Sequence, residues 1–148
     1  MIAEAPLVLD TNTVLALWYF NDPSLAPLAI AIAGGRVLLA SREEALAELD
    51  DVLSRARFGL TPEARARFLA DYRARLAFLP ALAAAPAFEL PECRDRDDQK
   101  FLEIARDAQA SHLLTRDKLL LKLARQRALR GRFQIVTPER FVAEGGGR

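Results

Sequence analysis

Short apolar runs that alternate with helical patterns constrain the fold of this chain most strongly. Five of them have the character of buried strands: "APLVL" (5–9), "RVLLA" (36–40), "AFEL" (87–90), "HLLT" (112–115) and "FQIV" (133–136). Strands that alternate with helices are typical of βαβ units, which build a parallel sheet with helices on both faces. We therefore predict an α/β fold with a mostly parallel sheet of about five strands.

The segments between these runs have helical patterns. Ser41 is predicted as an N-cap, and Glu44, three residues later, completes a capping-box pattern. Proline at the start of a helix and glycine after its end set several other boundaries. The first predicted helices lie at residues 14–18, from Pro23 to the glycines at 34 and 35, and after Ser41. The others lie from Thr61-Pro62 to about Leu79, from about Asp97 to Ala110, across residues 118–128, and after Thr137-Pro138.

Length and composition indicate one domain. The 148 residues, 51% of them hydrophobic, are enough for one core, which we place at residues 1–144 with a flexible glycine-rich tail at 145–148. Cys93 is the only cysteine, which excludes an internal disulfide and a cysteine-based zinc cluster. The N-terminus has no basic segment, and the apolar stretch 13–39 is interrupted by prolines and glycines, so we predict no signal peptide or membrane span and expect a cytoplasmic protein.

Acidic residues follow the predicted strands. Asp10 comes directly after "LVL", and Asp117 comes two residues after "HLLT". In open parallel sheets, ligands bind beyond the carboxyl ends of the strands, near the switch in strand order. Glu48 lies within a predicted helix, on the border of its apolar stripe. Three more acids, Asp95, Asp97 and Asp98, stand at the start of another helix.

Carboxylates gathered at one edge of the sheet need a counter-charge. Two charges 4 Å apart repel by about 4 kcal/mol at an effective dielectric constant near 20. Oxygen ligands with no histidine or cysteine nearby select Mg²⁺ or Mn²⁺. Such an ion lowers the pKa of a bound water and neutralises charge on a phosphodiester, which favours hydrolysis of a nucleic-acid backbone.

Helix capping is the alternative interpretation of each aspartate. Asp10 fits an N-cap as well as it fits a metal ligand. Asp95 is predicted to cap its helix, because it stands three residues before Asp98, as an N-cap residue stands before N3. An acid at this end of a helix gains about 0.3–1 kcal/mol from the helix dipole. Asp98 has apolar residues at i+3 and i+4, so it is the predicted site acid, and Asp97 is the second candidate.

Charge is divided unevenly along the chain. Residues 1–98 hold 10 basic and 15 acidic residues, whereas residues 99–148 hold 11 basic and 5 acidic ones. The basic excess is densest in "RDKLLLKLARQRALRGR", Arg116 to Arg132, with seven cations and one acid. A solvated helical face explains such a run, and so does contact with a phosphate backbone.

Four segments together resemble the PIN-domain family, in particular the toxin components of VapC-type toxin–antitoxin pairs: "LVLDTNTVL", "LAELDDVLSRARF", "CRDRDDQKFLEIARDAQASHLLTRDKLLL" and "IVTPERFV". The resemblance spans nearly the whole chain. It implies a three-layer α/β/α fold and an Mg²⁺- or Mn²⁺-dependent ribonuclease site. It also implies an RNA substrate, a cognate antitoxin protein and a homodimer or higher oligomer.

The resemblance carries over to individual residues. The family's acids match Asp10, Glu48, Asp98 and Asp117, with Asp97 as a neighbour. In this interpretation, three of them hold the metal (Asp10, Asp98 and Asp117), while Glu48 completes the acidic pocket or orients the attacking water. Asn12 and Thr115 match polar residues beside the metal, and the expected phosphate-binding residues are Arg116, Lys118 and Lys122.

One departure from the family pattern leaves a second function open. Many relatives have an aspartate shortly after "T.DK", where this chain has Leu119. The core acids are untouched, but a weaker or single-metal site is compatible with the change. The alternative to an endoribonuclease toxin is therefore a weakly active or inactive domain of the same fold that binds RNA or an antitoxin peptide.

Two other enzyme classes fit less well. "VLDTNTV" is similar to the nucleophile motif of haloacid-dehalogenase phosphatases, but the general-acid position holds Asn12, which has no acidic proton to donate. A Ser-His-Asp hydrolase would depend on His112, the only histidine, which lies in a predicted strand.

Overall fold

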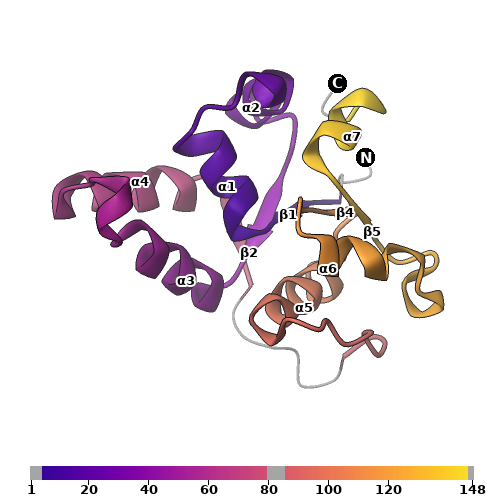
Figure 1. Ribbon diagram of the computed structural model, residues 1–148. Coiled ribbons are helices and arrows are strands. Elements are labelled where there is room, and N and C mark those ends of the chain that lie inside the picture. Colours follow the sequence, from indigo (N-terminus) through magenta and orange to yellow (C-terminus); the bar gives the residue numbers. More distant parts are fainter. Residues whose placement is uncertain (1–4, 80–85, 147–148) are drawn as a thin grey trace.

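A parallel sheet forms the centre of the computed structural model, which describes residues 5–79 and 86–146 (Figure 1). The strands are β1 (Leu7–Leu9), β2 (Leu39–Ser41), β3 (Leu76–Phe78), β4 (His112–Leu114) and β5 (Gln134–Val136). Their order in the five-stranded sheet is β3-β2-β1-β4-β5, and every neighbouring pair is parallel. The predicted α/β fold with a mostly parallel sheet of about five strands is confirmed.

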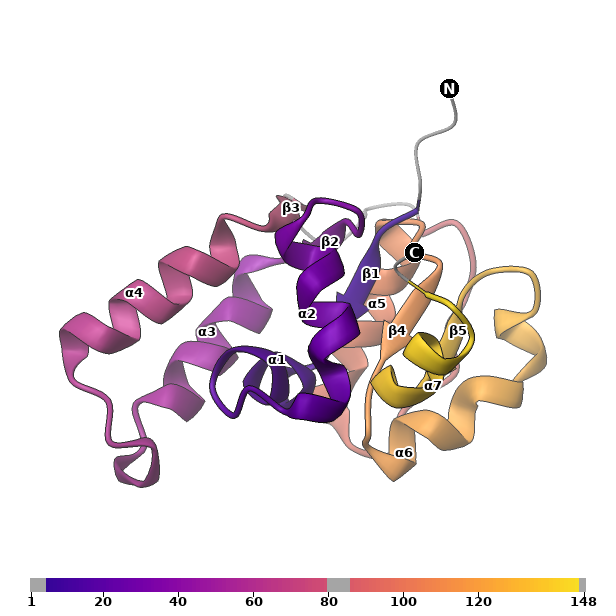
Figure 2. The ribbon, with the colours of Figure 1, turned by 90° about the horizontal axis from the view of Figure 1, so that it is seen from above.

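Helices cover both faces of the sheet. The α-helices are α1 (Thr11–Trp18), α2 (Ala26–Ala33), α3 (Glu43–Leu53), α4 (Pro62–Arg73), α5 (Gln99–Asp107), α6 (Lys118–Leu121) and α7 (Pro138–Ala143). In Figure 1, α2 and α7 lie above the sheet, and α5 and α6 lie below it. Figure 2, seen from above, has α1 and α2 in front of β1 and α5 behind it. The molecule thus has the three α/β/α layers that the family resemblance implied.

Alternation along the strands divides the core in two. Leu7 and Leu9 pack in one cluster with residues of α1, α2 and α7, while Val8 packs in the other with residues of α5. All three residues of β1 are buried, because the strand is central and covered on both faces. This two-sided burial explains why the strands have continuous apolar sequences instead of an alternating pattern.

The sheet has its switch in strand order between β1 and β4. From β1 the chain proceeds through β2 to β3 on one side, and β4 and β5 lie on the other side. Leu9 and Leu114 are partners in register, so the residues that follow them, Asp10 and Thr115, leave the sheet side by side. A crevice beyond the strand ends is expected at this point.

The predicted strand at residues 87–90 is wrong. Those residues form no strand, and the strand at the edge of the sheet beside β2 is β3. The sequence pattern predicts residues 76–78 as the end of the helix that starts at Pro62. That helix ends at Arg73. Phe88 and Leu90 are half-buried and pack against the core cluster that contains α5, so their hydrophobicity serves packing and not strand pairing.

Ser41 is not the N-cap of α3. It is buried as the last residue of β2, the N-cap position belongs to Arg42 in an extended conformation, and no side chain caps the helix. Glu44 pairs with the Arg42 guanidinium and does not complete a capping box. Pairing with β3 extends β2 through Ser41, and this tertiary contact overrides the local capping preference.

The predicted helix across residues 118–128 is broken. α6 ends at Leu121, 3₁₀ helices follow at Lys122–Arg125 and Arg127–Leu129, and Gln126 between them is extended. Leu120 and Leu129 are both buried in the same cluster. Nine residues on a straight helix would place them on opposite sides, at about 100° per residue. The break therefore lets both leucines reach one core.

The two ends of the chain bear on the remaining predictions. Gly145 and Gly146 donate backbone N–H groups to Val142 and Phe141 and close α7, while residues 147 and 148 of the predicted tail lie outside the described residues. The division into a domain at 1–144 and a tail at 145–148 stays a prediction. In the described part of the chain, no helix is long and apolar enough to span a membrane.

Candidate active site

Asp10 is a buried N-cap at the carboxyl end of β1. Its Oδ1 accepts from the Thr13 backbone N–H at 2.9 Å, which caps α1, and its Oδ2 accepts from the Thr115 hydroxyl at 2.5 Å. Burial raises the pKa of the Asp10 carboxyl, although both threonines lower it. The capping interpretation of Asp10 is confirmed, and capping leaves the residue at the crevice.

Thr115 connects Asp10 to Asp117. The Thr115 hydroxyl oxygen accepts from the Asp117 backbone N–H at 2.9 Å while its proton goes to Asp10. Asp117 is the N-cap of α6 and accepts from the backbone N–H groups of Leu119 and Leu120 at 2.8 and 3.3 Å. After burial and the effects of the threonines, the negative charge of Asp117 also raises the pKa of Asp10, so the two acids are close enough to interact.

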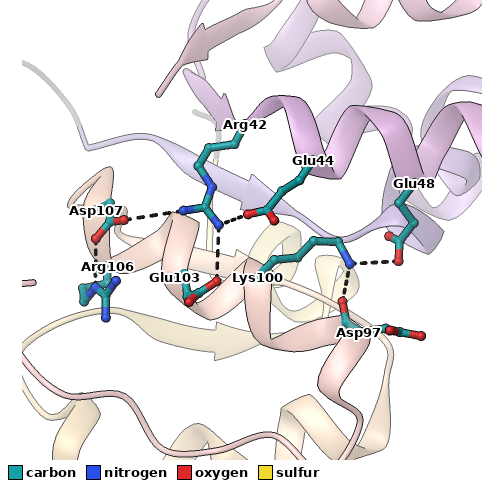
Figure 3. A network of polar contacts seen from close by, with 8 residues as sticks. All are labelled: Arg42, Glu44, Glu48, Asp97, Lys100, Glu103, Arg106 and Asp107. Carbon is teal, nitrogen blue, oxygen red and sulfur yellow. Dashed lines mark hydrogen bonds and ion pairs between the residues drawn. The ribbon is translucent and has the colours of Figure 1, made fainter. Parts of the chain in front are cut away.

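Glu48 lies in the middle of α3 and is contacted from two other helices. The Thr11 hydroxyl donates to its Oε2, and the Lys100 Nζ lies 2.9 Å from its Oε1. Lys100 also donates to the backbone carbonyl of Asp97 (Figure 3). Glu48 therefore has a fixed orientation between the first turn of α1 and the first turn of α5.

Asp98 is the acid most strongly affected by its surroundings. It ends the 3₁₀ helix Arg96–Asp98 immediately before α5, and its side chain is half-buried. Its pKa is raised to about 7, first by burial and then by the charges of Asp95, Asp117, Asp10 and Glu48. The acids from β1, α3, α5 and the β4–α6 turn thus share one electrostatic environment, as their sequence positions predicted.

The two acids beside Asp98 have different roles. Asp95 accepts the Asp97 backbone N–H at 3.0 Å, so its predicted role as a helix cap is confirmed. Asp97 is exposed, and its carboxylate points away from Lys100 and Glu48 (Figure 3). Only its backbone carbonyl contacts this cluster, which favours Asp98 over Asp97 as the site acid.

The predicted phosphate-binding cations differ in their partners. Arg116 donates to Glu139 at 2.5 Å and to Asp22 at 2.8 Å, and the Arg116 bond holds the pKa of Asp22 at about 2. Its charge is thus already balanced. Lys118 and Lys122 are exposed, and among the described residues neither forms a salt bridge. Their predicted role, and that of Arg116, stays a prediction.

The donor set fits a hard divalent cation by chemistry. The carboxylates of Asp10, Asp98 and Asp117 are the oxygen donors that Mg²⁺ and Mn²⁺ prefer. The pKa of Asp98 is raised first by burial and then by the negative charges of neighbouring acids, and a bound cation would relieve both effects. Within residues 5–79 and 86–146, however, no three acidic, histidine or cysteine side chains converge closely enough to form a coordination shell as they stand. Asn12 is exposed on the first turn of α1.

Thr11 and Lys100 were not predicted from the sequence. Both contact Glu48. In the sequence, however, Thr11 is indistinguishable from any residue in the first turn of a helix, and Lys100 from any solvent-exposed helix residue. Their signal in the sequence is adjacency alone: Thr11 follows Asp10, and Lys100 comes two residues after Asp98. Pairing across α1, α3 and α5 becomes apparent only when the helices are packed.

A second ionic cluster joins α3 to α5 away from these acids. The buried guanidinium of Arg42 lies 3.3 Å from Glu103 and 3.8 Å from Asp107, and it also pairs with Glu44 (Figure 3). Arg106 in turn lies 2.8 Å from Asp107. We call these five residues the Arg42 cluster. It fixes the start of α3, the helix of Glu48, against α5, the helix that Asp98 immediately precedes.

Comparison with known proteins gives one match. Residues 6–119 match the family described as PIN domain. The matched range contains all four predicted site acids and ends at Leu119. No curated protein matches the chain.

Proposed function

Because the chain belongs to the PIN-domain family, whose members are generally nucleases, we propose that it is a metal-dependent endoribonuclease that hydrolyses RNA phosphodiester bonds. The observation that carries the proposal is the placement of Asp10 and Asp117 at the switch in strand order, where the Thr115 hydroxyl contacts both residues. The pKa of Asp98, raised first by burial and then by the charges of acids that include these two, supports it. Acids that interact electrostatically at the carboxyl ends of parallel strands are typical of a site that binds a cation.

We assign the metal ligands to Asp10, Asp98 and Asp117. When bound, Mg²⁺ or Mn²⁺ would supply a more acidic water and stabilise the charge that develops on the phosphate. The Thr115 hydroxyl donates to the Asp10 carboxylate and accepts from the Asp117 backbone N–H, so it orients one ligand and fixes the backbone that carries the other. Partners that orient ligands in this way usually affect metal affinity or activity by about 10- to 100-fold when removed.

Glu48 is assigned to the attacking water. Its carboxylate is the one acid of the set with a lysine partner, since Lys100 lies 2.9 Å from Oε1. The Thr11 hydroxyl fixes the other oxygen. Because both carboxylate oxygens have a partner, the Glu48 carboxylate is held in one orientation. A general base or a water-orienting group needs such a fixed position relative to the water.

The biological role that we propose is that of a VapC-type toxin in a type II toxin–antitoxin pair. Its support is the sequence resemblance, which extends past the matched range to "IVTPERFV". A cognate antitoxin, self-association and phosphate contacts through Lys118 and Lys122, with Arg116 beside them, are parts of this proposal. A gene for a small DNA-binding protein immediately upstream would support the toxin role, and growth arrest on expression that the neighbour relieves would test it.

Cleavage by the purified protein tests the nuclease proposal. RNA incubated with the protein and Mn²⁺ or Mg²⁺ should be cut internally, and EDTA should stop the reaction. Asp10→Asn should remove the activity because it removes a ligand charge. Asp71→Asn, an exposed acid on α4, is the matched control and should retain full activity. Cleavage that persists in Asp10→Asn would refute the site assignment.

A domain of the same fold that binds without cutting is the second candidate. It is favoured by the separation of the acidic side chains in the described residues and by Leu119 in place of an acid. Isothermal titration with Mn²⁺ separates the two candidates. An active site should bind Mn²⁺ and lose that binding in Asp98→Asn, whereas a site without metal affinity would favour the second candidate.

A further inference from the structure

A groove of about 810 Å³ lies along β5 at the outer edge of the sheet, and arginines dominate it. Arg125, Arg130 and Arg132 come from the segment that follows α6, and Arg140 comes from α7. In Figure 1 that segment and α7 lie on opposite sides of β5. Four guanidinium groups from two separate parts of the chain therefore line one hollow.

Most of this positive charge has no internal partner. Among the described residues, no acid lies within salt-bridge distance of Arg125, Arg130 or Arg132, whereas Arg140 pairs with Glu144 at 2.8 Å. All four arginines are exposed. Arg116, by contrast, is neutralised by two acids. Three exposed guanidinium groups without an acidic partner among the described residues thus line one hollow.

The exposed side chains of the groove are mainly cationic. Its large hydrophobic lining residues are buried, with at most 5% exposure in Leu129, Phe133, Ile135 and Val136, and the exposed apolar residue among them is the small Ala124. They offer no open pocket for the apolar anchors that a bound peptide needs. The large exposed side chains that a ligand meets are the four arginines and Gln134.

The guanidinium of Arg132 is held in place. It lies 4.5 Å from the ring centroid of Phe88, a cation–π contact that fixes its plane. An arginine with a fixed plane loses less conformational entropy when its N–H groups bind phosphate oxygens in pairs. The groove therefore contains at least one phosphate donor that is already oriented.

The groove is separate from the candidate active site. None of Asp10, Glu48, Asp98 and Asp117 lines it. It includes Ser111 and His112 at the start of β4, whereas the acids lie beyond the end of that strand. A ligand can therefore occupy the groove without displacing anything at the acids.

From the groove's charge, exposure and position we propose that it binds the phosphodiester backbone of single-stranded RNA, as an anchor for substrate outside the cleavage site. The inference rests on the proposed ribonuclease function for the identity of the RNA as substrate. The chemistry is sequence-independent, because guanidinium groups contact phosphates and not base edges. A long RNA then has two contacts with the protein, and a short one has only the acidic site.

Binding measured without metal tests the anchor directly. Fluorescence anisotropy of a labelled single-stranded RNA in EDTA should give an affinity at least tenfold lower for Arg125→Ala/Arg130→Ala than for the wild type. The salt dependence should weaken as well, since each lost phosphate contact to a single strand removes about 0.7 from the slope of log affinity against log salt, or about 1.4 for two. Both residues are exposed, and an unchanged thermal unfolding curve would confirm that the variant is folded.

Matched controls identify what the groove recognises. Arg36→Ala/Arg67→Ala removes the same charge from exposed positions outside the groove and should leave affinity and slope unchanged. Equal losses in the two double variants would overturn the proposal, because they would show a general charge effect. Displacement of the RNA by polyglutamate of equal charge as effectively as by unlabelled RNA would also overturn it, in favour of an acidic protein segment.

Cleavage separates this inference from the proposed function. With metal present, Arg125→Ala/Arg130→Ala should raise KM for a long RNA without changing kcat, and kinetics on an RNA of a few nucleotides should stay the same. Groove-dependent RNA binding in a protein that never cleaves would refute the ribonuclease and leave the anchor standing. Normal cleavage of long RNA with unchanged KM in the double variant would refute the anchor alone.

Discussion

The two ends of the contact between α3 and α5 differ in charge balance, although both are ionic. At one end, the Arg42 cluster sets buried guanidinium groups against acids, so positive and negative charges lie together. At the other end, Lys100 is the cation that contacts Glu48, and the pKa of Asp98 is raised to about 7, first by burial and then by the charges of neighbouring acids. The balanced end holds the helices, and the unbalanced end is suited to bind a cation.

The difference follows from burial. Arg42 and Asp107 are exposed by only 4% and 7%, and a charge so far from water must have partners in the protein. Asp98 is only half-buried, so it can tolerate crowding by like charges, either by holding a proton or by binding an external cation. Position relative to solvent thus separates a structural ionic cluster from a candidate binding site.

Breaking the balanced end should have the largest effect. Arg42→Ala removes the cation that Glu103 and Asp107 share, and disruption of a buried ion pair costs about 3–5 kcal/mol of the free energy of unfolding. Urea unfolding measures this loss, with Arg55→Ala, an exposed arginine, as the control. A loss below about 1 kcal/mol would show that the cluster behaves like a surface salt bridge.

Removing charge from the unbalanced end should affect activity instead of folding. Asp98→Asn should lower RNA cleavage by more than about 100-fold, beyond the range that residues supporting a metal ligand usually show. Asp97→Asn next to it should retain most of the activity, because the Asp97 carboxylate points away from the cluster (Figure 3). Comparable losses in both variants, measured as kcat/KM at saturating Mn²⁺, would contradict the choice between the two acids.

Changing the cation at the unbalanced end should separate metal binding from catalysis. Lys100→Met removes a positive charge 2.9 Å from Glu48, so Mn²⁺ should bind several-fold more tightly while cleavage falls about tenfold as Glu48 loses its orientation. Titration calorimetry and steady-state kinetics give the two values. Lys100→Arg, which keeps the charge, should stay near the wild type in both, and weaker Mn²⁺ binding by Lys100→Met would refute this role.

The last prediction concerns the pH dependence of stability in the metal-free protein. The Asp98 pKa is raised to about 7, chiefly by burial, so between pH 4 and 7 the folded state holds a proton that the unfolded chain has lost. The free energy of unfolding should therefore fall as pH rises through this window and level off above it. Asp10, whose pKa burial also raises, contributes with the same sign.

Unfolding in EDTA at a series of pH values checks this expectation. Asp98→Asn should flatten the fall between pH 4 and 7 and make the metal-free protein more stable than the wild type above pH 7, since it removes a charge that its neighbours repel. Saturating Mn²⁺ should reduce the difference between the two proteins. A wild-type stability that rises with pH in EDTA would mean that Asp98 is balanced by a cation after all.

Much of the fold could be predicted from local pattern. Four of the five strands lie where apolar runs predicted them, and helices alternate with the strands as the helix-boundary residues predicted. The errors occur where a distant part of the chain decides. β3 exists because β2 offers it an edge, and the segment after α6 breaks because Leu120 and Leu129 must enter the same core.

The candidate site shows the same division. Asp10, Glu48, Asp98 and Asp117 could be chosen from the sequence, because strand ends, a helix border and a helix start place acids in predictable directions. The partners of these acids could not be chosen, since the contacts of Glu48 with Thr11 and Lys100 join residues that are 37 and 52 positions apart. No local period encodes such a pairing.

By itself, the sequence determined the α/β class, the parallel sheet and the acids of the candidate site, since these depend on the spacing of apolar and acidic residues along the chain. Only the tertiary structure decided which edge strand completes the sheet, that Thr115 connects two of the acids, and that arginines from two segments line one groove beside β5. These features depend on packing between distant segments, and burial and charge balance are properties of that packing.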